Sequence, residues 1–280
     1  MSFRRFILQL LWVYAGLVFL SLLLALLGQP VPPILTPLST SVCFVFALLH
    51  AGRRLGWQRA AAFLIIAFCI ALIFESLGVA TGYVYGPYHY TDSLGQKFLG
   101  LVPFLVPLAW FMMMYPSLVI ADRLLPGQSY WKSVLLRRLA AAGLGGVIMT
   151  AWDLSLDPLM VASNHWVWDV KGSYFGIPLQ NYWGWWLTAF IVLFIYQEVS
   201  CRLRPFQAVS ALSDGYLVTS YLVTAGGSVV IDSFTHLGGP ALVGLFAIFP
   251  WVMAGYLGVY HDENLPEDGR KEWIKYVGES

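Results

Sequence analysis

The chain has 280 residues, of which 59% are hydrophobic and only 11% are charged, and its mean hydropathy is +0.70. This composition excludes a soluble globular domain and an intrinsically disordered chain. Only three cysteines are present, in or beside apolar runs and without metal-ligand spacing, which excludes a disulfide-built domain. A net charge of +1 and the absence of a basic tract give no indication of a nucleic-acid partner. We therefore predict an integral membrane protein.

Uncharged apolar runs between charged or Pro- and Gly-rich breaks predict eight transmembrane helices, since a span needs about 20 apolar residues. In chain order the predicted spans are Phe6–Leu27, Ile34–Leu49, Ala60–Ala80, Leu101–Ala121, Leu139–Leu156, Gly184–Ile195 with a few residues more, Gly215–Ile231 and Ala241–Val259. The second run is short and the fifth is rich in Gly and Ala, so seven spans is the alternative count. The expected fold class is all-α, a polytopic transmembrane helical bundle over residues 1–259 followed by a charged cytoplasmic tail over residues 260–280.

The distribution of basic residues tests this topology independently, because cytoplasmic loops collect Lys and Arg. With the N-terminus inside, 14 of the 16 basic residues fall in inside segments, and only Lys97 and Lys171 fall outside. This asymmetry favours eight spans with both termini cytoplasmic, in a multi-pass protein of the cell inner membrane. The first run follows Arg4 and Arg5 but is long and lacks a small-x-small cleavage site, so we interpret it as a span rather than a signal peptide.

Six acidic residues lie outside the inside loops and the tail, and all of them fall on the outer half of the predicted bundle: Glu75, Asp92, Asp153, Asp157, Asp169 and Asp232. Acids within membrane spans are costly and indicate function by default. Asp153 and Asp157 are four residues apart and share a helix face, while Glu75 and Asp232 lie near the outer ends of the third and seventh spans.

Two like-charged carboxylates in a low-dielectric site cannot both ionise cheaply, so at least one is expected to hold its proton near neutral pH and to serve as a general acid. Taken singly, each acid is as well explained by a helix cap, a tyrosine hydrogen bond or pairing with a lysine. Taken together, the four acids of the spans favour a functional site.

Aromatic residues make up 16% of the chain and concentrate in two predicted outer loops, Thr81–Tyr90 and Asn164–Trp186. An interfacial belt of Trp and Tyr accounts for about half of them. We predict that the remainder folds back as a lid over the carboxyl groups, with Gly86-Pro87 and Gly176-Ile177-Pro178 supplying the turns.

Missing groups exclude several classes of membrane enzyme. The five histidines are not paired as a di-iron centre requires, and a prenyltransferase needs more basic residues near its acids. The run Gly143–Gly146 lies within a span, where helix packing explains it better than a nucleotide loop does. No site for a redox cofactor is visible. Metal-free, cofactor-independent acid catalysis remains, in which aromatic faces stabilise a carbocation and a second carboxylate activates water.

Several motifs carry a resemblance to a known family. They are Phe74–Gly82 (FESLGVATG), Tyr85–Tyr90 (YGPYHY), Val102-Pro103-Phe104, Tyr115-Pro116-Ser117, and Asp157-Pro158 through Asn181–Trp185 (NYWGW). In these motifs the chain resembles the CruF-type carotenoid 1,2-hydratases of bacteria and archaea, which act in bacterioruberin, myxoxanthophyll and deinoxanthin-type pathways. The resemblance extends from about residue 60 to about residue 260. It implies a polytopic membrane enzyme that adds water across the terminal 1,2 double bond of an acyclic ψ-end group, as in lycopene or γ-carotene, to give a tertiary alcohol at C-1.

On this resemblance, one of four acids protonates C-2 and another orients the water that attacks C-1; the four are Asp153, Asp157, Glu75 and Asp232. Seven aromatic residues are expected to line the polyene channel or to screen the cation, namely Tyr85, Tyr88, Tyr90, Trp110, Trp166, Trp168 and Trp185. Asn181 is expected either to hold the water or to occupy a loop turn. The implied partners are the carotenoid substrate, the lipid bilayer and other carotenoid-pathway enzymes.

Two alternatives from other classes are a non-catalytic carotenoid- or lipid-binding membrane protein and a proton-coupled transporter. A transporter is expected to carry carboxylates on both sides of the midplane, whereas the span acids of this chain all lie on one side. The sequence therefore favours the hydratase and leaves the binding protein as the main alternative.

Overall fold

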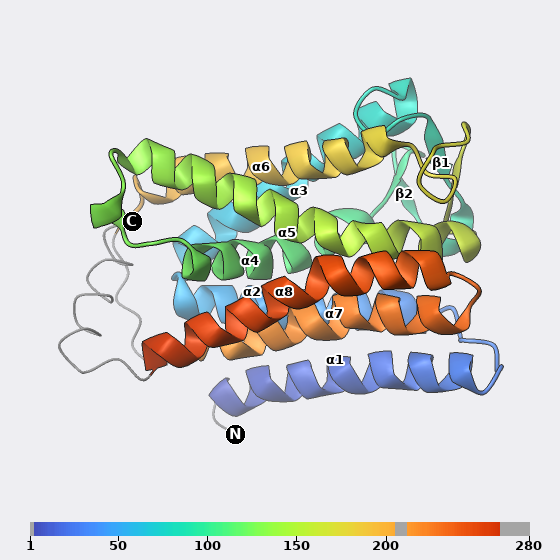
Figure 1. Cartoon of the computed structure of the whole chain (residues 1–280), viewed down its shortest axis with the longest axis horizontal. Helices are drawn as coiled ribbons and strands as arrows, with labels where there is room; N and C mark the ends of the chain where they lie inside the picture. Colours follow the sequence, from blue (N-terminus) through green and yellow to red (C-terminus); the bar gives the residue numbers. More distant parts are fainter. Residues whose placement is uncertain (1–2, 205–211, 264–280) are drawn as a thin grey trace.

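A computed structural model describes residues 3–204 and 212–263 of the chain. The described part contains eight long helices: α1 (Phe3–Leu26), α2 (Leu35–Arg54), α3 (Trp57–Thr81), α4 (Leu105–Leu124), α5 (Val134–Ala162), α6 (Leu179–Ser200), α7 (Gly215–Phe234) and α8 (Gly238–Glu263). They run roughly along one long axis, and the start of α1 and the end of α8 lie at the same end (Figure 1). Most of the predicted tail, residues 264–280, falls outside the described residues.

Seven of these helices are long and apolar enough to cross a membrane, all except α6. α6 is 22 residues long and packs against α5 and α3, so it lies within the bundle beside the spans. Its polar side chains Asn181, Tyr182 and Tyr196 are buried in the interior of the bundle. The predicted all-α polytopic bundle is confirmed, and the chain is a multi-pass helical membrane protein.

α4 is the most enclosed of the seven spans. In the apolar segment of α4, 72% of the residues are buried inside the protein, whereas the share is 17% in α1 at the margin of the bundle. Contacts from α2, α3, α5 and α8 surround α4. Side chains that α4 contributes to a site are therefore held by packing on several sides, whereas much of α1 is left for lipid.

α5 is longer than the predicted fifth span, and the predicted end at Leu156 is wrong. The helix begins after Ser133, whose hydroxyl accepts the Leu136 N–H at 3.1 Å, and it continues past Pro158. Proline removes the N–H that would bond to the Leu154 carbonyl; the Tyr174 hydroxyl donates to that carbonyl instead, at 2.7 Å. The vacated acceptor is thereby satisfied, and Asp153 and Asp157 lie inside the helix rather than at its end.

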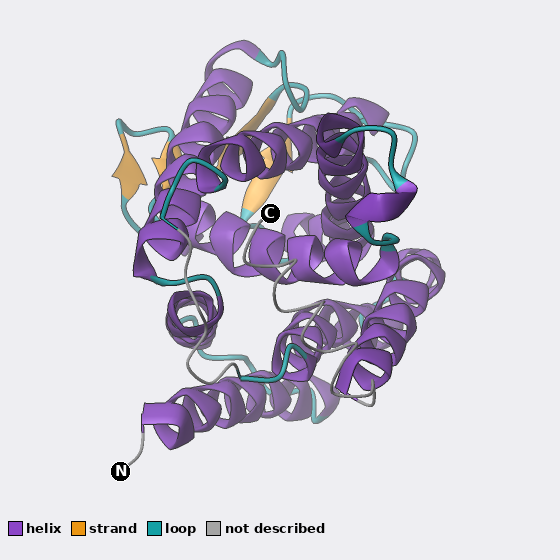
Figure 2. Ribbon diagram, turned by 90° about the vertical axis from the view of Figure 1, so that its left-hand side faces the viewer, coloured by secondary structure: helices purple, strands orange, loops and turns teal. Residues whose placement is uncertain are grey.

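Four short strands form two antiparallel ribbons. β1 (Tyr88–Tyr90) pairs with β4 (Trp166–Trp168), and β2 (Lys97–Phe98) pairs with β3 (Val102–Pro103). The strands gather at the end of the bundle opposite the start of α1 (Figure 1). Figure 2, which views the bundle end-on, shows them in orange among the upper helices, away from α1. The β1–β4 ribbon joins the two aromatic loops that were predicted to fold back together. Gly82 ends α3 in the left-handed conformation, with a φ of 71° that a residue bearing a side chain rarely adopts.

At the opposite end, Asp214 holds three helices together through two arginines. Its carboxylate accepts from Arg54 Nε at 2.8 Å and from Arg123 Nη2 at 2.6 Å. Burial by itself raises the pKa of Asp214, but the guanidinium groups of Arg54 and Arg123 outweigh it and lower the pKa to about 2. The ends of α2 and α4 are thus joined to the start of α7 by a buried ion-pair cluster.

Candidate active site

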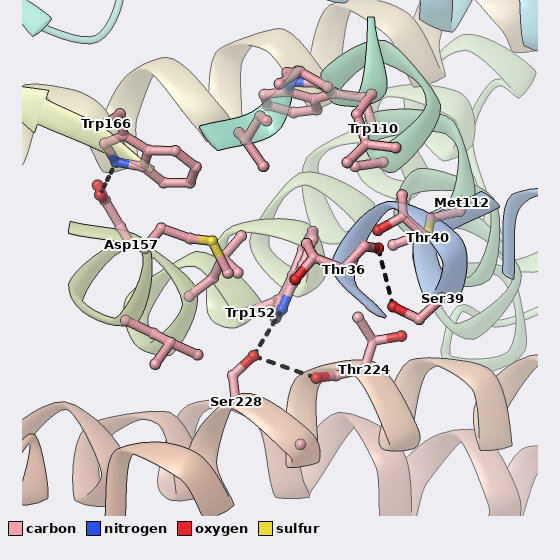
Figure 3. Close-up of a pocket in the computed structure, with 18 of the residues that line it drawn as sticks. Thr36, Ser39, Thr40, Trp110, Met112, Trp152, Asp157, Trp166, Thr224 and Ser228 are labelled. Atoms are coloured by element: carbon pink, nitrogen blue, oxygen red, sulfur yellow. Dashed lines mark hydrogen bonds between the residues drawn. The ribbon is translucent and has the colours of Figure 1, made fainter. Parts of the chain in front are cut away.

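A cavity of about 220 Å³ lies beneath the β1–β4 ribbon, bounded by helices α1 to α7. Every residue predicted to bind substrate lines it: Tyr85, Tyr88, Tyr90, Trp110, Trp166, Trp168, Asn181 and Trp185. Of the four predicted acids, Glu75 and Asp157 line the cavity directly, and Figure 3 shows Asp157 beside Trp166 at its wall. One cavity therefore brings together acids and aromatic residues that are widely separated in the sequence.

Glu75 is buried on α3 and accepts three hydrogen bonds. The hydroxyls of Tyr88 and Tyr90 donate to Oε2, the latter at 2.8 Å, and Trp110 Nε1 donates to Oε1 at 2.8 Å. Tyr88 and Tyr90 are alternate residues of β1, so their side chains point to the same face. Burial and the adjacent Glu75 carboxylate raise the pKa of both tyrosines well above the ordinary value. Both hydroxyls therefore remain protonated donors to Glu75.

The second acidic group is a pair of aspartates bridged by one amide. Asn181, in the first turn of α6, donates through Nδ2 to Asp153 Oδ2 at 2.7 Å and to Asp157 Oδ2 at 2.8 Å. The other oxygen of Asp157 accepts the indole N–H groups of Trp166 at 2.6 Å and of Trp168 at 3.2 Å. Asp157 is thus fully hydrogen-bonded, and both hydrogens of the Asn181 amide are used.

Asp153 has a different environment from Asp157. It is fully buried, and its Oδ1 has no hydrogen-bond partner among the described residues. The buried hydroxyl of Tyr182 likewise has none in that part of the chain. Asp153 does not line the cavity and reaches it only through Asn181. Within the pair, Asp157 is therefore the member in contact with the cavity and Asp153 is its buried partner.

No ion pair given by the described residues includes Glu75, Asp153 or Asp157. Lys97, one of the two outer lysines, instead bonds to Asp92 at 2.8 Å. Within the described part of the chain, no three His, Cys, Asp or Glu side chains are grouped as ligands for a metal ion. Hydrogen bonds from neutral donors alone therefore hold the three carboxyl groups.

Asp232 is separate from this arrangement. It accepts a hydrogen bond from Ser155 Oγ at 2.7 Å, and it does not line the cavity. The sequence groups Asp232 with the other three span acids, but unlike Glu75 and Asp157 it does not line the cavity. Asp232 bonds to Ser155 of α5 and not to Asp153 or Asp157 of the same helix.

The aromatic walls pack closely against one another. The rings of Trp110 and Trp185 lie 4.3 Å apart between centroids, and Trp152 meets Trp185 edge to face at 5.9 Å. The glycine of the NYWGW motif, Gly184, is required by close packing, because a Cβ there would lie 2.5 Å from the Val84 carbonyl oxygen. The absence of a side chain at this position lets the Tyr85 loop reach α6, where the Tyr85 hydroxyl bonds to Thr188 at 2.8 Å.

Sequence reasoning missed a wall of hydroxyl groups on α1, α2 and α7. The hydroxyl-bearing lining residues on these helices are Tyr14, Ser21, Thr36, Ser39, Thr40, Thr224 and Ser228, five of which are labelled in Figure 3. Tyr14 bonds to Thr224 at 2.6 Å, and Trp152 Nε1 donates to Ser228 at 3.4 Å. The available signal was spacing: Thr224 and Ser228 are four residues apart, and small polar residues at helical spacing in an apolar span indicate an inward face.

Comparison with known proteins identifies the family. The family model described as "Carotenoid biosynthesis protein" matches residues 31–250. The chain is also similar to the bisanhydrobacterioruberin hydratase of Haloarcula japonica, with 30% identity over 174 residues. That alignment covers 61% of this chain and 56% of the relative, so the chain matches little more than half of the relative's length. No solved structure matches. Because the family model spans most of the chain, the protein belongs to the carotenoid biosynthesis protein family.

Proposed function

We propose that the protein is a cofactor-independent carotenoid 1,2-hydratase of the cell inner membrane. It adds water to the terminal 1,2 double bond of an acyclic ψ-end group, of the lycopene or γ-carotene type, and yields a 1-hydroxy carotenoid. The observation that carries the proposal is that two buried carboxyl groups, Glu75 and Asp157, face one cavity with aromatic walls. The hydratase activity in the name of the Haloarcula relative supports it. The bilayer supplies the apolar substrate, and other carotenoid-pathway enzymes are the expected partners.

Asp157 is assigned the role of general acid. Asp153 and Asp157 share one bridging amide, and two charges so close in a dry site are unfavourable, so the pair retains one proton. Asp157 is the member that lines the cavity. Its proton goes to C-2, the electron pair of the double bond forms the new C–H bond, and the positive charge is left on the tertiary carbon C-1.

Glu75 is assigned the role of base. Like Asp157, it accepts from three donors, which stabilises the ionised carboxylate. Unlike Asp157, it shares none of these donors with a second carboxyl group of the described residues, so no like charge beside it favours retention of a proton. Its charge and the faces of the surrounding Tyr and Trp rings stabilise the cation at C-1. A water oxygen then bonds to C-1 and its proton passes to Glu75. Return of that proton to the aspartate pair balances the cycle, so one water is consumed and no external cofactor is needed.

The regiochemistry follows from the substrate more than from the protein. Protonation at C-2 gives a tertiary cation, whereas protonation at C-1 would give a less stable secondary one. The site needs only to place C-2 near Asp157 and to admit one water on the side of Glu75. The apolar walls exclude further water, which keeps the electrostatic interactions within the site strong.

The test uses membranes that contain the expressed full-length protein, lycopene as substrate, and water labelled with oxygen-18 under anaerobic conditions. We expect one labelled oxygen per hydroxyl group formed. The variants Asp157→Asn and Glu75→Gln keep the shape of each acid and are expected to lose the product while retaining bound pigment. Absence of label from any product of the wild-type protein would sink the proposal. Pigment binding without turnover would instead identify a carotenoid-binding protein.

A further inference from the structure

A second pocket lies at the opposite end of the bundle, where the basic residues predict the cytoplasmic side. It has a volume of about 80 Å³ and lies between α2, α3, α4, α5 and α6. Four arginines line it, Arg54, Arg59, Arg137 and Arg138, whereas Asp122 is the one acid in the described lining. The site proposed for hydration uses none of these residues. A concave site lined by four guanidinium groups is suited to an anion.

Carboxylates only partly balance these arginines. Arg54 pairs with Asp214 at 2.8 Å and Arg138 pairs with Glu198 at 3.0 Å. The pair between Arg137 and Asp122 is longer, at 3.4 Å. Among the described residues, the four arginines of the lining meet three carboxylates, Asp122, Asp214 and Glu198, and Asp214 is shared with Arg123.

Arg59 is the residue that points most directly to a ligand. It is only 8% exposed, it lines the pocket, and its Nε is buried without a hydrogen-bond partner among the described residues. A buried guanidinium N–H without an acceptor is costly, because the lost hydration is not replaced. An anion in the pocket would supply the missing acceptor.

The helices add to the positive potential of this pocket. Arg59 is the third residue of α3, and Arg137 and Arg138 lie within the first five residues of α5. A helix N-terminus presents unpaired N–H groups and favours an anion. Neither helix has an acidic residue in its first turn. Cations at two positive helix ends repel both the helix dipoles and each other, and an anion between them would relieve that repulsion.

We propose that this pocket binds a phosphate group, either in the headgroup of an anionic phospholipid of the cytoplasmic leaflet or as free inorganic phosphate. The planar guanidinium of Arg59 matches phosphate oxygens in a fork geometry that the compact ammonium of lysine cannot reproduce. Anionic lipids concentrate in the leaflet that faces the basic end of the protein. The proposal is independent of the hydratase assignment, because it concerns the other end of the molecule.

The test is native mass spectrometry of the full-length protein released from detergent. Dioctanoyl phosphatidylglycerol, dioctanoyl phosphatidylcholine and inorganic phosphate are titrated in turn. We expect one phosphatidylglycerol to be retained with about tenfold preference over phosphatidylcholine, and Arg59→Ala to weaken its retention about tenfold through loss of charge-assisted hydrogen bonds. Lys132→Ala is the matched control, since Lys132 is an exposed cation near the same end that does not line the pocket.

Displacement of phosphatidylglycerol by inorganic phosphate would support the proposal and show that the phosphate group alone suffices for binding. Retention of phosphatidylglycerol without such displacement would support it with the lipid headgroup as the ligand. Equal retention of the two lipids would overturn it, because the net negative charge of the headgroup would then play no part and apolar contact with the acyl chains would explain binding. Equal effects of Arg59→Ala and Lys132→Ala would overturn it in favour of diffuse surface attraction. If Arg59→Ala does not fold, Arg59→Lys replaces it. It keeps the charge but lacks the fork, so a wild-type affinity for this variant would also overturn the proposal.

Discussion

Tyr88 and Trp168 lie directly opposite each other in the β1–β4 ribbon, with their ring centroids 5.0 Å apart. Their polar groups nevertheless serve different acids: the Tyr88 hydroxyl donates to Glu75, and Trp168 Nε1 donates to Asp157 at 3.2 Å. The opposed pair two residues along the ribbon, Tyr90 and Trp166, divides its donors in the same way. One small ribbon therefore positions the proposed base and the proposed acid relative to each other, although these lie on different helices.

The two indole donors to Asp157 are expected to contribute unequally. Trp166 bonds at 2.6 Å and Trp168 at 3.2 Å, and short hydrogen bonds to a carboxylate are the stronger ones. Proton transfer to the substrate leaves Asp157 charged, and loss of a hydrogen bond to a charged group costs about 1.5–3 kcal/mol. Trp166→Phe is therefore expected to lower kcat/KM by about tenfold or more. Trp168→Phe is expected to lower it less. Initial rates of hydroxycarotenoid formation measure both variants, and the reverse order of effects would contradict the ranking.

Asn181 is expected to act as a positioning residue for the aspartate pair. Asn181→Leu keeps a similar volume but removes both bridging donors, leaving buried carboxyl oxygens unsatisfied. We expect kcat to fall by about two orders of magnitude with little change in KM, because proton sharing is disturbed and the aromatic walls are not. The pH profile of kcat is also expected to change. A lower unfolding temperature with an unaltered kcat would show instead that Asn181 serves only the fold.

The separation of Asp232 from the cavity predicts that it is not required for the reaction. Asp232→Asn retains an oxygen that can accept the Ser155 hydrogen bond, so the local packing is preserved. We expect the rate to stay within about twofold of the wild-type rate, whereas the matched change Asp157→Asn abolishes turnover. Both variants are compared in the same membranes with equal amounts of protein. A loss in Asp232→Asn as large as that in Asp157→Asn would return Asp232 to the catalytic set.

Gly184 is expected to be a packing requirement of the site. In Gly184→Ala the new Cβ would lie 2.5 Å from the Val84 carbonyl oxygen and 2.6 Å from a ring carbon of Tyr85. Overpacking of this kind costs about 1–3 kcal/mol, so the unfolding temperature in detergent is expected to fall. Gly143→Ala in α5 is the control, because a Cβ there meets nothing within 4 Å and the exchange gains up to about 1 kcal/mol in helix propensity. Equal unfolding temperatures for the two variants would contradict this prediction.

The Asp214 cluster predicts how stability depends on pH. The pKa of Asp214 is about 2 in the folded protein and 3.8 without these contacts, so the folded state binds the proton more weakly than the unfolded state. The stabilisation is therefore fully present above about pH 4 and is lost as the pH falls toward 2. Unfolding temperatures of the wild-type protein and of Asp214→Asn are compared between pH 7 and pH 3. The variant is expected to be less stable at pH 7, and the difference is expected to narrow in acid; a constant difference would contradict the assignment.

The sequence by itself determined that this is a helical membrane bundle and that its span acids lie toward one end of it. Apolar length and the placement of arginines are sufficient for that, because the bilayer requires each span to satisfy its own backbone. Helix ends were harder to predict. α6 begins at Leu179 rather than near Gly184, and α5 continues through Pro158, because the polar groups of Asn181 and Tyr174 find partners inside the fold.

The eight residues that the sequence analysis predicted to bind substrate all line the cavity. Only the tertiary structure decided which donor meets which acid, that Asp157 rather than Asp153 reaches the cavity, and that Asp232 bonds to Ser155 instead. The hydroxyl wall of α1, α2 and α7 also became visible only there. The physical reason is that helical periodicity sets which residues share a face of one helix, whereas side-chain packing sets which faces of different helices meet.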